Sequence, residues 1–327
     1  MDAIEDGAIA SGRRPLDGIT EAFSGARLEQ AIRPGGDRVV LKYLPREGDW
    51  LTRATGGSGR LRHLWESGML GRVQPLVDHT ILEIREVSGE DVVVMRDASD
   101  DLLPPKEPVS TETSLQLLAG LAGMHDGFAN ETAQGLCSIA SRYAMFAPTF
   151  HHSDDGPGRH PLSDRIDLGW ELFAEHVDSD VVEAIFAVHR APDVLERRLE
   201  QFPPTLLHGD AKLENLGLSP AGKLVAIDWG DLTGVGPCEV DVAWYALKGS
   251  VRIGRSPDAL FVQYERARGR PLDPDATDLA CLGSLAQMGF RFAVGAFASG
   301  PEPAEIAVSQ LDWWIARVRD ALDRIGW

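Results

Sequence analysis

The chain has 327 residues, of which 43% are hydrophobic and 25% charged, and its formal net charge at pH 7 is −18. A chain of this length can bury one large core or two smaller ones, so we expect a soluble globular protein of one domain or two lobes. The acidic balance argues against nucleic acid and anionic membrane surfaces as partners, because both attract clustered lysine and arginine. It is compatible with cationic small molecules, although solubility is its simplest explanation.

Targeting and cysteine patterns predict a cytoplasmic protein. The first residues, MDAIEDGAIASGRRP, have no basic start followed by an apolar run, and no later segment is expected to supply the roughly 20 apolar residues that span a bilayer. Cys137, Cys238 and Cys281 are odd in number and far apart in sequence. This spacing predicts buried free thiols and neither disulfides nor a metal site.

The first 100 residues are expected to form a small, mostly antiparallel sheet with one helix. Between the second and third β-rich runs, the turn formers Pro34, Gly35 and Gly36 favour a hairpin. A short helix is predicted over 59–70, where apolar residues recur at helical spacing. The β-rich runs cover residues 19–24, 26–32, 37–44, 79–87 and 90–97.

The rest of the chain is expected to be mainly helical. A stretch rich in Pro and Asp, residues 97–110, predicts a linker, and Ser110 or Thr111 is a suitable cap for a helix over 110–128. An irregular loop is predicted over 151–161. Further helices are predicted over 180–191, 192–202, 275–297 and 305–325, and strand-like runs over 205–210, 215–219 and 223–229.

The three strand-like runs carry a dense polar motif. HGDAKLEN contains His208, Asp210, Lys212 and Asn215, and VAIDWG places Asp228 at the end of the next strand. In kinases an H-x-D-x-x-x-x-N loop supplies a base for the substrate hydroxyl and a magnesium ligand, and a later aspartate binds metal. Phosphoryl transfer needs hard oxygen ligands for Mg²⁺ and a nucleophile held in line with the γ-phosphate, to which Lys212 could reach. The alternative is an ordinary β-hairpin with solvated turn residues.

An upstream lysine strengthens the kinase interpretation. On a strand, Lys42 in VVLKYL shares a face with Val40 and Leu44, which puts its ammonium among apolar side chains. Its place in the third strand matches the kinase lysine that pairs with the α- and β-phosphates. The alternative for Lys42 is an edge-strand position that faces water.

Taken together, these segments resemble the aminoglycoside phosphotransferase and choline kinase group, over about residues 20–320. The likeness rests on LLHGDAKLENLGL with KLVAIDWGDLTGVGPCEVDVAWYAL, on the hinge-like VVVMRDASDDLLP and on the helix LAGLAGMHDGF. It implies an α+β, two-lobed protein-kinase-like fold, with an antiparallel β-rich nucleotide-binding lobe over 1–97 and a larger helical catalytic lobe over 98–327. The implied activity is ATP- and Mg²⁺-dependent phosphorylation of a hydroxyl on a small molecule such as a hydroxylated antibiotic or metabolite. A nucleotide-binding pseudokinase and a phosphoester hydrolase are the alternatives.

The resemblance also implies residue roles. Asp210 would be the catalytic base, supported by His208 and Lys212, with Asn215 and Asp228 as metal ligands. For the nucleotide, Ser24 and Gly25 would cover the phosphates and Lys42 would pair with them. Glu66 would be the partner of Lys42, with a solvated position as the alternative. The hinge residues Met95, Arg96 and Ala98 would contact the adenine.

The acceptor is less specified by the sequence. Only about a dozen residues separate Asp228 from Asp241, which leaves no room for the activation segment that docks peptide substrates, so we expect a small-molecule acceptor. Asp241 is expected to cap a helix and brace the motif loop, and His125 to be a satisfied core residue. Six carboxylates on the large lobe or just beyond Asp228 favour a cationic acceptor slightly over a neutral sugar or nucleoside. These residues are Asp154, Asp155, Glu171, Glu175, Asp231 and Glu239.

Overall fold

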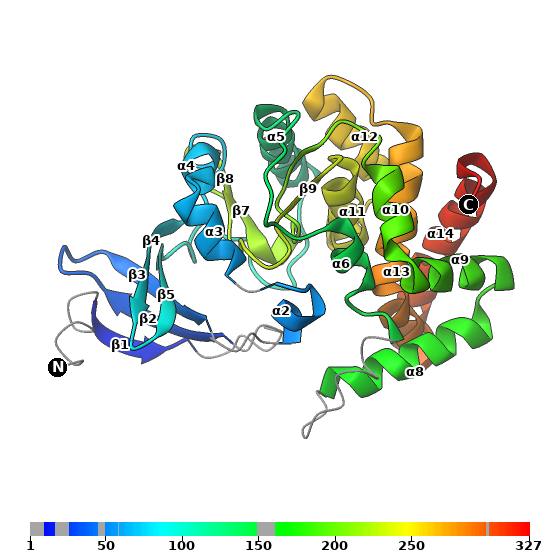
Figure 1. The fold of residues 1–327 in the computed structure, drawn as a ribbon, viewed down its shortest axis with the longest axis horizontal. Coiled ribbons are helices and arrows are strands. Elements are labelled where there is room, and N and C mark those ends of the chain that lie inside the picture. Colours follow the sequence, from blue (N-terminus) through cyan, green and yellow to red (C-terminus); the bar gives the residue numbers. More distant parts are fainter. Residues whose placement is uncertain (1–9, 17–25, 45–49, 58, 149–160, 299–300) are drawn as a thin grey trace.

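The computed structural model describes residues 10–16, 26–44, 50–57, 59–148, 161–298 and 301–327. A five-stranded antiparallel sheet lies at one end of the molecule and a larger body of helices at the other, with two-stranded sheets between them (Figure 1). The predicted α+β, two-lobed fold is confirmed.

The five-stranded sheet has the strand order β1-β2-β3-β5-β4. The predicted hairpin joins β2 to β3 through a turn in which the Arg33 amide donates to the Asp37 carbonyl at 2.9 Å. Strand β1 was not predicted, and the run over 19–24 lies outside the described residues. The strands are β1 (Ser11–Pro15), β2 (Arg27–Ile32), β3 (Arg38–Leu44), β4 (Ile81–Val87) and β5 (Glu90–Arg96).

Strand β3 alternates between two environments. Val39, Leu41 and Tyr43 are buried in a small core on one face of the sheet. Lys42 lies on the opposite face, and its side chain is only 13% exposed. Because β3 is hydrogen-bonded to β2 and β5 on its two sides, the edge-strand alternative for Lys42 is wrong.

The single helix predicted over 59–70 is two helices, α3 (Arg60–Glu66) and α4 (Met69–Val73). Gly68 separates them in the left-handed conformation, with φ 74°, which interrupts the helical path. Together with α2 (Trp50–Ala54), they bury apolar side chains in the core that also holds the helices of the large lobe. The N-terminal helices therefore attach the sheet to the rest of the protein.

The large lobe is built around α13, which is buried along most of its length. With the π-helical turn η2 (Val294–Ala298), α13 forms the one described segment long and apolar enough to cross a membrane, and 83% of its apolar window is buried. This corrects the expectation that no segment is so apolar; core helices meet the same criterion. The helices are α5 (Thr111–Gly127), α6 (Ile139–Ala144), α8 (Pro161–His176), α9 (Ser179–Arg190), α10 (Pro192–Leu199), α11 (Glu239–Ile253), α12 (Pro257–Arg268), α13 (Pro274–Ala293) and α14 (Pro301–Ile325).

Short strands and a 3₁₀ turn lie between the lobes and carry the polar motif. Strand β6 pairs with β9, and β7 with β8, in both cases antiparallel. The strand-like runs predicted over 215–219 and 223–229 are thereby confirmed, whereas β9 was not predicted. The elements are β6 (Thr205–Leu207), η1 (Leu213–Asn215), β7 (Leu216–Leu218), β8 (Leu224–Ala226) and β9 (Gly234–Gly236).

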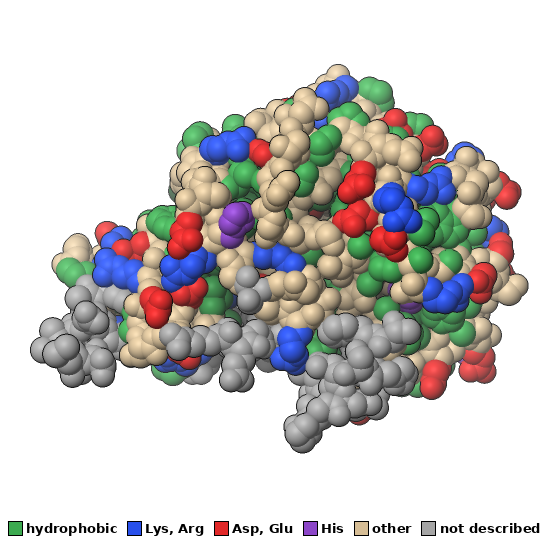
Figure 2. All heavy atoms as spheres, viewed as in Figure 1, with side chains coloured by type: hydrophobic (Ala, Val, Ile, Leu, Met, Phe, Trp, Pro, Cys, Tyr) green, Lys and Arg blue, Asp and Glu red, His purple; other side chains and the backbone are tan. Residues whose placement is uncertain are grey.

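Surface charge is mixed on the face shown in Figure 2, where acidic and basic side chains lie among one another. No large basic patch is visible among the described residues of this face, in keeping with the net charge of −18.

Candidate active site

The motif loop after β6 is held by the N-terminal part of α11. Asp241 is fully buried, and its carboxylate accepts the backbone amides of His208 at 2.7 Å and Gly209 at 3.0 Å. Gly209 has φ 84°, and a Cβ there would collide with the carbonyl oxygen of Leu232, so no other residue fits. Asp241 therefore braces the loop as expected, but it is not the helix cap, because the N-cap of α11 is Cys238.

The charge of Asp241 is maintained by its neighbours. Burial alone would raise its pKa, but a hydrogen bond from His125 and the charge of Arg142 lower the pKa below its ordinary value. His125 is itself fully buried, and its Nδ1 lies 2.7 Å from the Tyr264 hydroxyl. His125 is thus a satisfied core residue, as predicted.

His208 links the loop to the segment before Asp228. Its Nε2 lies 3.0 Å from the Ile227 carbonyl, and its Nδ1 lies 3.2 Å from the Asp210 amide. Because a carbonyl can only accept and an amide can only donate, the proton of the neutral ring is on Nε2. Burial lowers the pKa of His208. The imidazole is therefore a neutral positioning group that is fully used by the backbone.

Asp210 is surrounded by three donors. Its Oδ2 accepts from Lys212 Nζ at 2.7 Å and from Asn215 Nδ2 at 2.9 Å, while its Oδ1 accepts from the indole of Trp244 at 2.9 Å. The residue is 8% exposed. Burial lowers the pKa of Lys212, but its hydrogen bond with Asp210 and the nearby charges of Asp210, Asp228 and Glu214 together raise it, so the net pKa shift is upward. The carboxylate is held in one orientation, and its Oδ1 accepts no second hydrogen bond from a described residue.

Asn215 and Asp228 present oxygen atoms next to this group. The amide nitrogen of Asn215 is used by Asp210, which leaves its amide oxygen without a hydrogen bond to a described residue. Asp228 has φ 66°, a left-handed conformation that aspartate tolerates better than most residues. Lys42 Nζ lies 2.7 Å from Asp228 Oδ1 and lowers the pKa of that carboxyl to about 2. Residues 42, 210, 215 and 228 thus come together as the sequence predicts.

Comparison with known proteins places this geometry in a family. The family model described as "Phosphotransferase enzyme family" matches residues 60–279, which is more than half of the chain. The chain belongs to this family. Membership confirms the predicted resemblance and identifies a small-molecule phosphotransferase. No curated protein sequence matches the chain.

Several solved structures share the fold of the phosphotransferase. Choline kinase LicA from Streptococcus pneumoniae has 13% identity and a TM-score of 0.53, over 98% of this chain and 97% of that one. An aminoglycoside phosphotransferase from Streptomyces rimosus, solved with ADP and streptomycin, has 14% identity and a TM-score of 0.53, over 88% and 96%. A microcompartment-associated aminopropanol kinase has 18% identity and a TM-score of 0.51, over 97% and 94%. At these identities the likeness concerns the fold.

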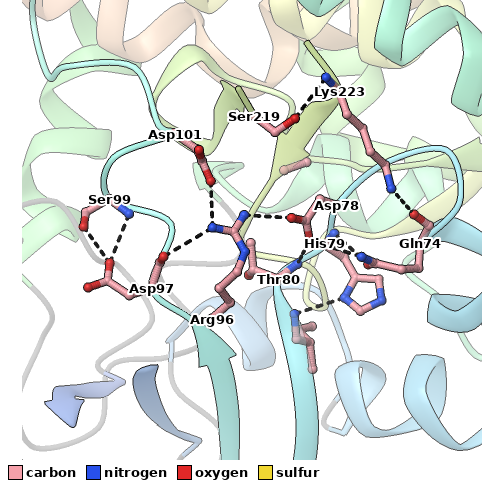
Figure 3. Close-up of polar contacts among 12 residues, drawn as sticks. Gln74, Asp78, His79, Thr80, Arg96, Asp97, Ser99, Asp101, Ser219 and Lys223 are labelled. Atoms are coloured by element: carbon pink, nitrogen blue, oxygen red, sulfur yellow. Dashed lines mark hydrogen bonds and ion pairs between the residues drawn. The ribbon is translucent and has the colours of Figure 1, made fainter. Parts of the chain in front are cut away.

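The hinge of the phosphotransferase follows β5. The guanidinium of Arg96 bridges Asp78 Oδ2 and Asp101 Oδ2, each at 2.7 Å (Figure 3). The Ala98 carbonyl accepts the Asp101 amide at 2.9 Å, whereas the Ala98 N–H donates to none of the described residues. Met95, half-buried, packs against the main core. The Arg96 side chain therefore fixes the hinge, while one backbone donor in it stays available.

Two segments beside the Arg96 side chain are bonded to the β7–β8 hairpin. On one side, the Leu218 amide donates to the Asp101 carbonyl at 3.0 Å. On the other, the Asp78 amide donates to Leu224 at 2.9 Å, and Asp78 accepts from Ala226 at 3.0 Å. Figure 3 shows Asp78 and Asp101 on opposite sides of Arg96. The hairpin that leads from Asn215 to Asp228 is thus fixed relative to the hinge.

The structure does not bring Glu66 to Lys42. Glu66 is 61% exposed on α3 and forms its ion pair with Arg62 at 3.2 Å, one helical turn away. Arg62 also pairs with Asp91 on β5 and so docks the helix on the sheet. The expected role of Glu66 beside Lys42 is therefore wrong, and the solvated position is correct. Ser24 and Gly25 lie outside the described residues.

Three of the carboxylates expected around a cationic acceptor lie on the surface of α8 or at the start of α13. Glu171 and Glu175 are exposed on α8. Glu239 is buried and accepts the Asp273 amide at 3.0 Å, at the start of α13. For Asp231 the structure gives a backbone contact, in which its carbonyl accepts from the buried Arg60 at 2.8 Å. Asp154 and Asp155 lie outside the described residues, as do the histidines at 151, 152 and 160.

The prediction from sequence missed residues on α11 and its neighbours. Trp244 contacts the candidate base, and Lys248 lies one turn further along the same helix. The sequence EVDVAWYALK could have indicated both residues. Positions 241, 244 and 248 are spaced by three and four residues, so Trp244 and Lys248 share one helix face with Asp241. Arg142 on α6 and Arg291 on α13 had no such signal, since only the fold brings them near.

Proposed function

We propose that this phosphotransferase catalyses Mg²⁺-dependent transfer of the γ-phosphoryl group of ATP to a hydroxyl group of a small molecule. The supporting observation is the convergence of Lys42, Asp210, Asn215 and Asp228. The Lys42–Asp228 ion pair joins residues 186 positions apart at 2.7 Å, and Asn215 is bonded to Asp210 at 2.9 Å. Each of these residue types is one that phosphoryl transfer requires.

The nucleotide would lie between the sheet and the motif loop. Lys42 would pair with the α- and β-phosphates, and Ser24 and Gly25 would cover them with backbone amides. The adenine would contact the hinge backbone at Arg96 and Ala98, beside Met95. The unused N–H of Ala98 supports this proposal, because an adenine ring nitrogen accepts such a hydrogen bond.

The donor set at residues 215 and 228 fits Mg²⁺. The described residues contain no cluster of three or more His, Cys, Asp or Glu side chains that could enclose a metal ion. Mg²⁺ usually takes one or two carboxylates together with waters and substrate phosphates. The free amide oxygen of Asn215 and the carboxylate of Asp228, which is 46% exposed, are ligands of this kind. Bound there, Mg²⁺ would neutralise charge that develops on the phosphates.

Asp210 would act as the general base. The acceptor oxygen forms a bond to the γ-phosphorus while the bond from that phosphorus to the β-γ bridging oxygen breaks. ADP leaves with the electron pair, and the hydroxyl proton passes to Asp210 Oδ1. Lys212 would stabilise the γ-phosphate, while His208 keeps the loop in position.

We further propose the lobe division at residues 97 and 98, a cytoplasmic location and a small-molecule acceptor. The segment between Asp228 and Asp241 supports the last point. It holds β9, which is paired with β6, and so leaves little chain for docking a peptide.

Replacement of the base tests this function. Asp210→Ala and Asp210→Asn should lower kcat by about 10²- to 10⁴-fold while the Kd for ADP changes less than about threefold, because the base does not hold the phosphates. Asp193→Ala, a change at an exposed carboxylate on α10, is the control and should leave both values unchanged. A wild-type protein that binds ATP but phosphorylates nothing in a wide acceptor screen would instead support the pseudokinase alternative.

A further inference from the structure

Positive charge collects around Asp210 in an otherwise acidic protein. Lysine occurs only five times in the chain, yet Lys42, Lys212 and Lys248 all lie near the candidate site. The first two have carboxylate partners, Asp228 and Asp210. Lys248 has no ion pair or hydrogen bond with a described residue, which is unusual in a chain with a net charge of −18.

Lys248 occupies a defined place beside the base. It lies on the face of α11 that also carries Trp244, and its Nζ is 5.7 Å from the Trp244 ring centroid. That ring is 5% exposed and donates to Asp210 Oδ1 at 2.9 Å. Lys248 itself is half-buried. Its ammonium is thus partly desolvated, one side chain away from the reacting oxygen.

Two arginines add to this charge. Arg291 is half-buried near the end of α13, a helix that packs against α11, and it forms no ion pair with a described residue. Arg142 is 3% exposed; its Cζ lies 5.0 Å from the Trp244 ring, and its Nε and Nη2 have no hydrogen-bond partner. Burial lowers the pKa of Lys248 to about 8. The positive charges of Arg291 and Lys212 also lower this pKa, whereas the negative charges of Asp210 and Glu214 raise it. Among the described residues, Lys248 and Arg291 therefore have no carboxylate partner here, whereas the charge of Arg142 acts on Asp241.

The side from which an acceptor reaches Asp210 follows from its hydrogen bonds. Oδ2 is occupied by Lys212 and Asn215, on the side of Asp228. Trp244 is the one donor to Oδ1 among the residues that the structure describes, which leaves a lone pair on that oxygen for a ligand. An acceptor hydroxyl that binds this lone pair lies next to Trp244, within reach of Lys248.

We propose, on the basis of the kinase function above, that the acceptor carries an anionic group, carboxylate or phosphate, that is bound by Lys248 and Arg291. A half-buried cation without a counterion is unfavourable, and an anionic ligand removes that cost when it binds. A cationic acceptor, such as an aminoglycoside or an amino alcohol, would instead be repelled. This proposal differs from the cationic acceptor favoured from sequence, which was based on Asp154, Asp155, Glu171, Glu175, Asp231 and Glu239.

A charge-matched screen tests the proposal. ATP consumption is measured with small hydroxycarboxylates (glycerate, malate, gluconate), sugar phosphates, neutral sugars and polyols, and amino alcohols with aminoglycosides. We expect the highest kcat/KM among the hydroxycarboxylates or the sugar phosphates, and those two arms identify the anionic group. Between about 20 and 200 mM KCl, the KM of that acceptor should rise, because salt screens the attraction.

Replacement of Lys248 tests whether this residue binds the anionic group. Lys248→Met should raise the KM of the best anionic acceptor about 10- to 100-fold, with kcat and the Kd for ADP changed less than about threefold. Lys106→Met, at an exposed lysine of the linker, is the control and should change none of them. In parallel, glycerate and gluconate are titrated by calorimetry into wild-type and Lys248→Met protein saturated with ADP and Mg²⁺. Binding that Lys248→Met abolishes supports the proposal even without turnover.

Three results would overturn the proposal. One is a best acceptor that is cationic or neutral and indifferent to Lys248→Met. Another is a variant that weakens ADP binding but not the KM of the acceptor, which would assign Lys248 to the nucleotide. The third is the absence of both binding and turnover for every anionic compound. The first two leave the kinase function standing, whereas failure of all four compound classes to consume ATP would contradict that function itself.

Discussion

Trp244 should contribute to catalysis although it is not one of the residues proposed to bind the nucleotide. Its indole N–H donates to Asp210 Oδ1 at 2.9 Å, and Trp244→Phe removes this donor while most of the ring volume remains. The carboxylate would keep two partners, Lys212 and Asn215, both on Oδ2. Oδ1 would then lose its fixed direction, and with it the alignment of the acceptor hydroxyl.

The expected loss of activity follows from the charge of Asp210, the carboxylate that accepts this hydrogen bond. A buried hydrogen bond to an ionised group contributes about 1.5–3 kcal/mol. If that contribution is lost from the transition state, kcat should fall about 10- to 100-fold, since about 1.4 kcal/mol corresponds to a factor of ten. The Kd for ADP should stay within about twofold, because Trp244 lies on the acceptor side of Asp210.

A matched variant separates positioning from stability. Trp170 on α8 is 3% exposed, and its indole donates to the Phe146 carbonyl at 2.7 Å, so Trp170→Phe also deletes one buried indole hydrogen bond. Both variants should lower the melting temperature by a few degrees, but only Trp244→Phe should lower kcat. Steady-state kinetics, ADP titration and thermal unfolding of the two proteins provide the comparison. Equal kcat values in the two variants would refute the positioning role of Trp244.

Three further predictions concern metal, hinge and pH. Asp228→Asn should raise the midpoint of the Mg²⁺ titration of activity at least tenfold, because a hard dication loses an anionic ligand; an unchanged midpoint would remove Asp228 from the metal site. Arg96→Met should lower the free energy of unfolding by about 1–3 kcal/mol in urea titrations, because the half-buried Asp78 and Asp101 lose their shared partner; no loss would show that the bridge is dispensable. Burial lowers the pKa of Lys248 from 10.5 to about 8, so its positive charge is lost as pH rises through 8. The KM of an anionic acceptor should increase above that pH in wild type but not in Lys248→Arg, and the wild-type free energy of unfolding should rise between about pH 8 and 10.5, where the unfolded chain binds more protons.

The site was predictable where its chemistry depends on local spacing. Asp210 and Asn215 lie five residues apart in one loop and turn, so their contact is largely a property of that segment. Lys42 was assigned to a face of β3 by simple alternation, and pairing on both sides of the strand then buried it. These inferences needed only the period of a strand and the length of a loop.

The rest depends on packing between distant segments. Glu66 was expected beside Lys42 because it is the only glutamate of its helix, but the break at Gly68 and the Arg62 pair keep it at the surface. Arg291 reaches the site only through the packing of α13 against α11, for which no short-range pattern exists. Strand β9 has three residues, too few for a periodic signal.

The scarcity of lysine has a practical consequence for covalent chemistry. With a pKa of about 8, Lys248 has roughly a tenth of its amine uncharged at pH 7, against well under a thousandth for an ordinary lysine. Lys42 and Lys212, by contrast, are held by carboxylates. Only the neutral amine is nucleophilic, so an amine-directed electrophile at neutral pH should modify Lys248 before the other four lysines. Such a reagent would label the surroundings of Trp244 and Asp210 selectively, and protection by a bound anion would reveal which compounds bind there.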